Sequence, residues 1–143
     1  MILTILHALI WAWIGAITMF TVTVSPTVFA TLDGPQASAF LRAYFPRLFK
    51  YEVAVGLAII ALSIALSTGG ETYQYGISVG LVVTLLAYLN LRVIMPRVNI
   101  VSDQLAAEPS PATKKQFALL HGLSVGFFMI NAISMIALFV FGS

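Results

Sequence analysis

Four long apolar stretches alternate with shorter polar segments along the chain. They cover residues 2–31, 48–67, 75–95 and 117–141. A helix rises about 1.5 Å per residue, so about 20 apolar residues cross the roughly 30 Å hydrocarbon core of a bilayer. Each stretch reaches that length. The pattern therefore predicts four membrane-spanning α-helices.

A shorter segment, residues 35–45, lies between the first two spans and has an apolar face. Asp33 or Gly34 can cap a helix here, Pro35 suits its first turn, and Pro46 is expected to end it. Apolar residues at helical spacing are typical of a helix that lies in the membrane interface. The sequence thus predicts a short interfacial amphipathic helix before the second span.

Prolines also mark the other segment ends. The first span is longer than a bilayer requires, so we expect it to be tilted, to bend near Pro26 or to project beyond the membrane. Pro96 is expected to stop or kink the third span. The polar residues 97–110 that follow are expected to form a loop. Ser110 can then cap the helix that begins at Pro111 and contains the fourth span.

Composition places the chain among integral membrane proteins. Hydrophobic residues make up 60% of its 143 residues and charged residues 8%, whereas a soluble domain carries roughly 45–50% and about 25%. We therefore expect one membrane domain over residues 1–143, with the lipid bilayer as its main partner. The absence of cysteine excludes a disulfide framework and a thiolate metal site.

The basic residues predict the orientation. The first and third connections contain six of the seven Lys and Arg residues, namely Arg42, Arg47, Lys50, Arg97, Lys114 and Lys115. The only charged residue of the short second connection is Glu71. Positive charge collects on the cytoplasmic side of a membrane. We therefore expect both termini outside, in an antiparallel four-helix bundle of the inner (plasma) membrane. The charges are topology signals, so no nucleic acid is expected as a partner.

The fourth span carries a polar stripe. His121, Ser124, Phe128, Asn131 and Met135 follow one another at spacings of three, four and seven residues, which place side chains on one helical face. A polar stripe on a helix in lipid must face protein or water. The other spans are therefore expected to cover this face.

Further polar residues fall in the inner halves of the spans. The candidate ligand-binding cluster consists of Ser25, Glu52, Asn90, Arg92, His121, Ser124 and Asn131. A charge at the centre of a bilayer costs roughly 2.5–3.5 kcal/mol, so we expect Glu52 to pair with Arg92. Two interpretations stay open. The cluster forms a binding pocket, or its members make structural contacts such as an interhelical hydrogen bond of Asn131.

The two histidines bear on metal or haem binding. His121 is the best single candidate for a metal ligand, and His7 is a weaker one. They lie near opposite ends of their spans, and neither has a metal-binding spacing, so haem or copper is not favoured. The chain shows no Ser/His/Asp constellation, phosphate loop or redox motif. These residues favour a non-enzymatic protein over an enzyme.

Several short motifs appear in order along nearly the whole chain. They are Ser25-Pro26-Thr27-Val28-Phe29, Phe45-Pro46-Arg47, Met95-Pro96-Arg97-Val98-Asn99 and Leu120-His121-Gly122-Leu123-Ser124, with Asn131 downstream. Together they resemble the transmembrane protein 205-like family of small four-span proteins. Its eukaryotic members are linked to platinum-drug resistance and export, which implies a transport-like role. A more distant similarity is to copper-resistance D proteins and four-span protoporphyrinogen oxidases, which use several histidines within their spans.

Three functions therefore remain as hypotheses. The first is a membrane protein that handles a small molecule or metal ion, as in resistance or transport. The second is a structural accessory subunit that docks on a larger membrane complex, or on further copies of itself, through faces of small residues such as Gly76 and Gly80. The third is a haem- or copper-binding membrane oxidoreductase.

Overall fold

The computed structural model describes residues 1–67 and 73–142 and is entirely helical in its ordered elements. The predictions for the second connection, including Glu71, lie outside these residues. Four continuous helical rods are long and apolar enough to cross a membrane. The chain is thus an all-α, multi-pass membrane protein, as its apolar pattern predicts.

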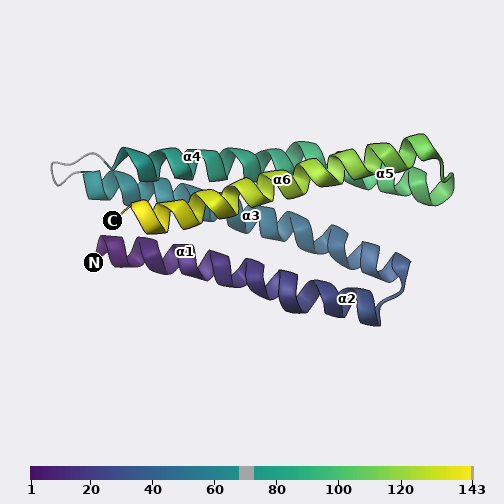
Figure 1. Cartoon of the computed structure of the whole chain (residues 1–143), viewed down its shortest axis with the longest axis horizontal. Coiled ribbons are helices and arrows are strands. Elements are labelled where there is room, and N and C mark those ends of the chain that lie inside the picture. Colours follow the sequence, from purple (N-terminus) through teal and green to yellow (C-terminus); the bar gives the residue numbers. More distant parts are fainter. Residues whose placement is uncertain (68–72, 143) are drawn as a thin grey trace.

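Two of the rods contain a π-helical turn. The first rod consists of α1 (Ile2–Met19), η1 (Phe20–Val24) and α2 (Ser25–Thr31), and the second is α3 (Gly34–Ser67). The third rod consists of α4 (Gln74–Leu89), η2 (Asn90–Ile94) and α5 (Met95–Ala107), and the fourth is α6 (Pro111–Phe141). Figure 1 shows the rods as two long hairpins, with both chain ends at one end of the molecule.

The core is packed at the end that holds the chain termini. Leu6, Ile10 and Trp13 of α1 are buried against α3, α4 and α6. Helices α3 and α4 approach most closely at Gly56 and Gly80. A Cβ atom added at Gly80 would lie 3.0 Å from the Gly56 carbonyl oxygen, which is closer than ordinary contact. The small-residue face of the third span therefore packs within the chain.

The prolines of the first and third rods follow π turns. The amide of Ser25 donates to the Phe20 carbonyl, and that of Met95 to the Asn90 carbonyl, five residues back in both cases. Proline has no N–H, so it breaks the α-helical bonding pattern, and a π turn is one way to absorb the change. At both prolines the helical rod continues through a π turn, so the third span does not stop at Pro96. The prediction that residues 97–110 form a loop is wrong, because α5 continues to Ala107.

The separation of an interfacial helix from the second span is also wrong. Residues 35–45 are helical, but they belong to α3, which runs without interruption through Pro46. The side chain of Arg47 donates a 2.5 Å hydrogen bond to the Ala43 carbonyl beside the proline, which supports the helix there. The two predicted caps are confirmed: the Gln36 amide donates to Asp33 Oδ1 at 2.9 Å, and the Thr113 amide to Ser110 Oγ at 3.1 Å.

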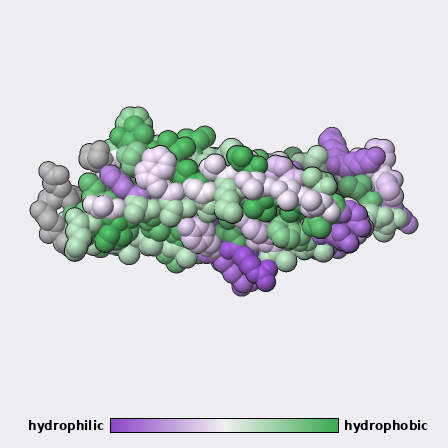
Figure 2. Space-filling view, turned by 90° about the horizontal axis from the view of Figure 1, so that it is seen from below, coloured by the Kyte–Doolittle hydropathy of each residue, from purple (hydrophilic) through white to green (hydrophobic). Residues whose placement is uncertain are grey.

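The surface divides into an apolar body and a polar end. Figure 2 shows apolar residues over most of one face, with hydrophilic residues chiefly toward the end where α2 meets α3 and α5 meets α6. At this end Arg42 forms an ion pair with Asp103, with 2.5 Å between Nη2 and Oδ1. This pair joins the start of α3 to α5, beyond the packed core.

Candidate functional site

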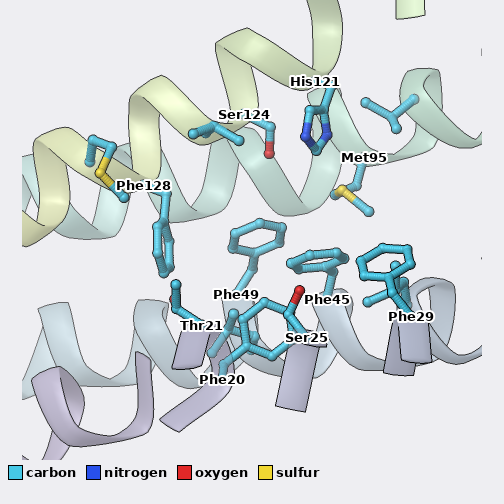
Figure 3. A pocket seen from close by; sticks show the side chains of 15 residues that line it. Phe20, Thr21, Ser25, Phe29, Phe45, Phe49, Met95, His121, Ser124 and Phe128 are labelled. Atoms are coloured by element: carbon cyan, nitrogen blue, oxygen red, sulfur yellow. The ribbon is translucent and has the colours of Figure 1, made fainter. Parts of the chain in front are cut away.

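A cavity opens between the two hairpins in the half of the molecule toward the polar end. Its volume is about 370 Å³, which falls within the roughly 300–1,000 Å³ of small-molecule sites. Its walls come from η1 and α2, from α3, from the start of α5, and from α6. Figure 3 shows these walls facing one another across the space.

Aromatic rings form much of the cavity wall. Phe45 and Phe49 lie one turn apart on α3, and their rings stack with centroids 5.9 Å apart. Phe20 of η1 contacts Phe45 edge-on at 5.5 Å. Phe128 of α6 closes the cavity on the opposite side. The arrangement presents flat, apolar surfaces to whatever enters.

Four polar side chains interrupt this apolar lining, and Thr21 of η1 is one of them. Ser25 lies on α2, and Ser124 and His121 lie on α6. In Figure 3 both α6 residues point across the cavity toward α2 and α3. The imidazole of His121 is stacked on Phe117 at 5.8 Å, which fixes its plane. Hydroxyl and imidazole groups both donate and accept hydrogen bonds, so they can hold the polar part of a bound molecule.

Both π turns lie beside the cavity. Phe20 and Thr21 of η1 line it, and so does Met95, which directly follows η2. Single π turns inside α-helices are frequent at functional sites. Here η1 forms part of one wall, and η2 directly precedes the part of α5 that forms another.

Two pairs of polar residues lie deeper in the protein. Asn90 donates from Nδ2 to the Ser124 carbonyl at 3.2 Å. Asn131 donates from Nδ2 to Glu52 Oε1 at 3.1 Å and to the Val83 carbonyl at 3.4 Å. Glu52, Asn90 and Asn131 are completely buried. These bonds tie α6 to α3, α4 and η2. The stripe on the fourth span therefore faces protein at Ser124, Asn131 and Met135, whereas His121 at its start is exposed.

The predicted cluster therefore separates into three parts. Ser25, Ser124 and His121 line the cavity, whereas Glu52 and Asn131 form a pair one turn beyond it. Arg92 is exposed on the surface, and the predicted pairing with Glu52 is wrong. In the described part of the chain the ion pair is between Arg42 and Asp103.

The histidines do not come together. His7 packs against Phe139 near the end of α6, and His121 packs against Phe117 near its start. With 1.5 Å per residue, the contact points are roughly 30 Å apart along α6. Within residues 1–67 and 73–142, no three His, Cys, Asp or Glu side chains gather where a metal ion could be held. The residues present do not fit a haem held by two histidines.

The aromatic walls of the cavity and the backbone partner of Asn131 were not predicted from the sequence. Phe45 and Phe49 are four residues apart, a spacing that places both rings on one helical face and signals the wall. The Val83 carbonyl carries no such signal, because a main-chain acceptor is present at every position.

Comparisons with known proteins agree with a small membrane protein. Residues 8–107, from α1 to the end of α5, match the family described as "Domain of unknown function (DUF4149)". An uncharacterized protein of Aquifex aeolicus (strain VF5) is 29% identical over 120 residues, which cover 83% of this chain and 80% of that protein. No solved structure matches. The family match spans more than half of the sequence, so the chain belongs to the DUF4149 family.

Proposed function

We propose that this protein binds a small apolar molecule with one polar group, taken up from the bilayer into the cavity between the hairpins. The role is non-enzymatic. The observation that carries the proposal is the cavity itself: about 370 Å³ of space inside a membrane protein. Its walls are aromatic, and a histidine and two serines supply hydrogen-bonding groups.

The chemistry of the lining defines the class of ligand. Flat aromatic walls bind rings and hydrocarbon chains through dispersion and apolar contact. His121, Ser25 and Ser124 offer hydrogen bonds to a hydroxyl or carbonyl group of the ligand. A charged ligand is disfavoured, because no charged side chain of the described residues lines the cavity. Metal-ion handling receives no support from this lining.

A transport role fits the same cavity as a later step. The resemblance to the transmembrane protein 205-like family suggests movement of a bound molecule, and binding is the first step of such movement. The alternative is an accessory subunit that docks through small-residue faces. Gly76 and Gly80 do not support it, since both are buried within the chain. Association with a second copy or a partner subunit is tested by purification in mild detergent, where a stable complex is expected if the alternative holds.

The proposed orientation in the plasma membrane places the cavity toward the cytoplasm. It rests on the basic residues in the first half of α3, in α5 and at the start of α6. The chain has no cysteine, so a single introduced cysteine is the one site that a thiol reagent can label. In right-side-out membranes, an impermeant thiol reagent is expected to label Gln74→Cys and to leave Ser110→Cys unlabelled. The reverse pattern would overturn the orientation.

Photolabelling tests the binding proposal. The probe is a medium-chain alcohol that carries a diazirine, which combines an apolar chain with one hydroxyl group. Reconstituted protein is irradiated with the probe, and labelled peptides are identified by mass spectrometry. We expect labels on cavity residues of α3 and α6, such as Phe49 and Phe128.

A pair of variants controls the test. Ser25→Phe places a ring in the cavity, whereas Thr27→Phe places the same ring on the exposed side of α2. Labelling of the cavity peptides is expected to fall several-fold in Ser25→Phe and to persist in Thr27→Phe. Equal labelling of cavity and lipid-facing residues in all three proteins would refute the proposal.

A further inference from the structure

Glu52 is an acidic residue at the centre of a membrane bundle. Its side chain has no exposed surface. Its hydrogen-bond partner Asn131 lies near the middle of the fourth apolar stretch, and Val83, whose carbonyl also accepts from Asn131, lies near the middle of the third. Glu52 is therefore near mid-depth in the membrane, deeper than its position near the start of the second stretch suggests.

The hydrogen bonds around Glu52 lack one donor. The Asn131 amide nitrogen donates to Glu52 Oε1 and to the Val83 carbonyl. Glu52 Oε2 and Asn131 Oδ1 are buried and have no partner among the described residues. Both of these atoms accept hydrogen bonds, and an ionised carboxylate has no hydrogen to offer. A proton on the Glu52 carboxyl group adds the missing donor.

No positive charge compensates Glu52 in the described part of the chain. On the helices packed against α3, the titratable or charged groups lie elsewhere: His7 on α1, Tyr75 and Tyr88 on α4, Arg92 on η2, Arg97 and Asp103 on α5, and Lys114, Lys115 and His121 on α6. None of them has a hydrogen bond or ion pair with Glu52. On α3 itself, Arg42 is bonded to Asp103, Arg47 donates to the Ala43 carbonyl, and Lys50 is exposed. An uncompensated charge at the bilayer centre costs roughly 2.5–3.5 kcal/mol even on insertion scales. The neutral carboxylic acid avoids that cost.

From these observations we propose that Glu52 and Asn131 form a proton-binding site inside the membrane. The ligand is a single proton taken from water, which converts the Glu52 carboxylate into a carboxylic acid. Asn131 holds the carboxyl group in place through its amide nitrogen. The site does not depend on a molecule occupying the cavity.

The cavity provides the route by which this proton exchanges. Leu48 and Phe49 line the cavity and precede Glu52 by one helical turn, and Phe128 precedes Asn131 by three residues. The inner end of the cavity is thus about 5 Å, one helical pitch, from the pair. Water that enters the cavity comes within about one helical turn of the site.

Infrared spectroscopy of the protein in lipid tests the proposal. A protonated carboxyl group has a carbonyl stretching band that carboxylates lack, and this band shifts in heavy water. The chain has only five acidic residues, of which Asp33, Asp103 and Glu108 are exposed. We expect the wild-type protein to show the band at neutral pH, with a shift after exchange into heavy water.

Substitutions assign the band. Glu52→Gln keeps the size of the side chain and is expected to abolish the band, whereas the exposed control Glu108→Gln is expected to retain it. Absence of the band in wild-type protein, or its persistence in Glu52→Gln, would overturn the proposal. Loss of the band on adding sodium ions would also overturn it, because the site would then be a cation site.

A second measurement covers the case in which Glu52→Gln does not fold. The double variant Glu71→Gln/Glu108→Gln leaves Glu52 as the one glutamate of the chain. Labelling with ¹³C-carboxyl glutamate then gives one side-chain carboxyl signal in nuclear magnetic resonance. A chemical shift typical of the acid at neutral pH supports the proposal, and a carboxylate shift refutes it.

Discussion

Replacing Gly80 by alanine tests whether the close approach of α3 and α4 holds the bundle together. The new Cβ would lie 3.0 Å from the Gly56 carbonyl oxygen, 3.1 Å from the Ile60 amide nitrogen and 2.6 Å from Ile60 Cγ1. Ordinary contacts at such positions are 3.4–4 Å. The side chain of Ile60 can rotate away, but the two backbone atoms move only if the helices separate by several tenths of an ångström.

The expected loss follows from two opposing effects. Overpacking a tight interface typically costs about 1–3 kcal/mol. Alanine in place of glycine regains about 0.5–1 kcal/mol, because the unfolded chain has less freedom to lose. We expect Gly80→Ala to lower the free energy of unfolding by about 1–2 kcal/mol. Gly56→Ala is expected to behave alike, because its Cβ would lie 2.9 Å from the Thr84 amide nitrogen.

Gly126 provides a matched control on α6. A Cβ atom at Gly126 meets nothing within 4 Å, so only the gain from alanine applies. Gly126→Ala is expected to be neutral or to stabilise the protein by up to about 1 kcal/mol. Unfolding by sodium dodecyl sulfate in mixed micelles, followed by the fluorescence of Trp11 and Trp13 and by circular dichroism, measures both variants. If Gly80→Ala and Gly126→Ala shift the midpoint in the same direction, the packing argument is refuted.

Three further predictions concern single contacts, and the same unfolding assay tests each. Asn131→Ala removes the donor to Glu52 Oε1 and the Val83 carbonyl and is expected to cost about 1–3 kcal/mol; wild-type stability would contradict the assigned bonds. Ser110→Ala removes the cap of α6 and is expected to cost about 1 kcal/mol, whereas alanine at the exposed neighbour Glu108 should leave stability unchanged. Outside the apolar core, hydrogen bonds from Arg42 hold the pKa of Asp103 below its ordinary value. The ion pair therefore stabilises the fold at pH values above the unfolded-state pKa of Asp103. This stabilisation is lost as the pH falls through the folded-state pKa. Arg42→Gln should remove that acid dependence, and an unchanged pH profile would show that the pair does not contribute.

The partner of Glu52 shows that the position of a residue along its span does not predict which side chain it contacts. Glu52 and Arg92 stand at similar distances from the charged ends of their spans, which favoured a pair. In the structure Arg92 is exposed and Glu52 is bonded to Asn131. A long arginine side chain can extend toward the headgroups from a surface position, so it needs no buried partner. Hydropathy reports how deep a residue lies, but it does not report which way the residue faces around the helix.

The spans and caps were predictable for a different reason. Apolar length and the capping residues Asp33 and Ser110 act locally, so they can be read without knowing the neighbours. Proline was less informative. Pro46 lies inside a continuous helix, whereas Pro26 and Pro96 follow π turns. A missing N–H has several structural solutions, and the surrounding packing selects among them.

The position of the cavity follows from a feature that the two hairpins share. In each, a π turn is followed by a proline, at Pro26 and Pro96, and then by a buried valine two residues later, at Val28 and Val98. A π turn holds one more residue than an α-helical turn, so it rotates every later side chain relative to the earlier ones. Four straight helices would carry one packed stripe along their whole length. Here the main core cluster lies on the side of the turns that holds the chain termini, and the cavity lies beside the turns. The prolines therefore bear on the position of the cavity as well as on helix geometry.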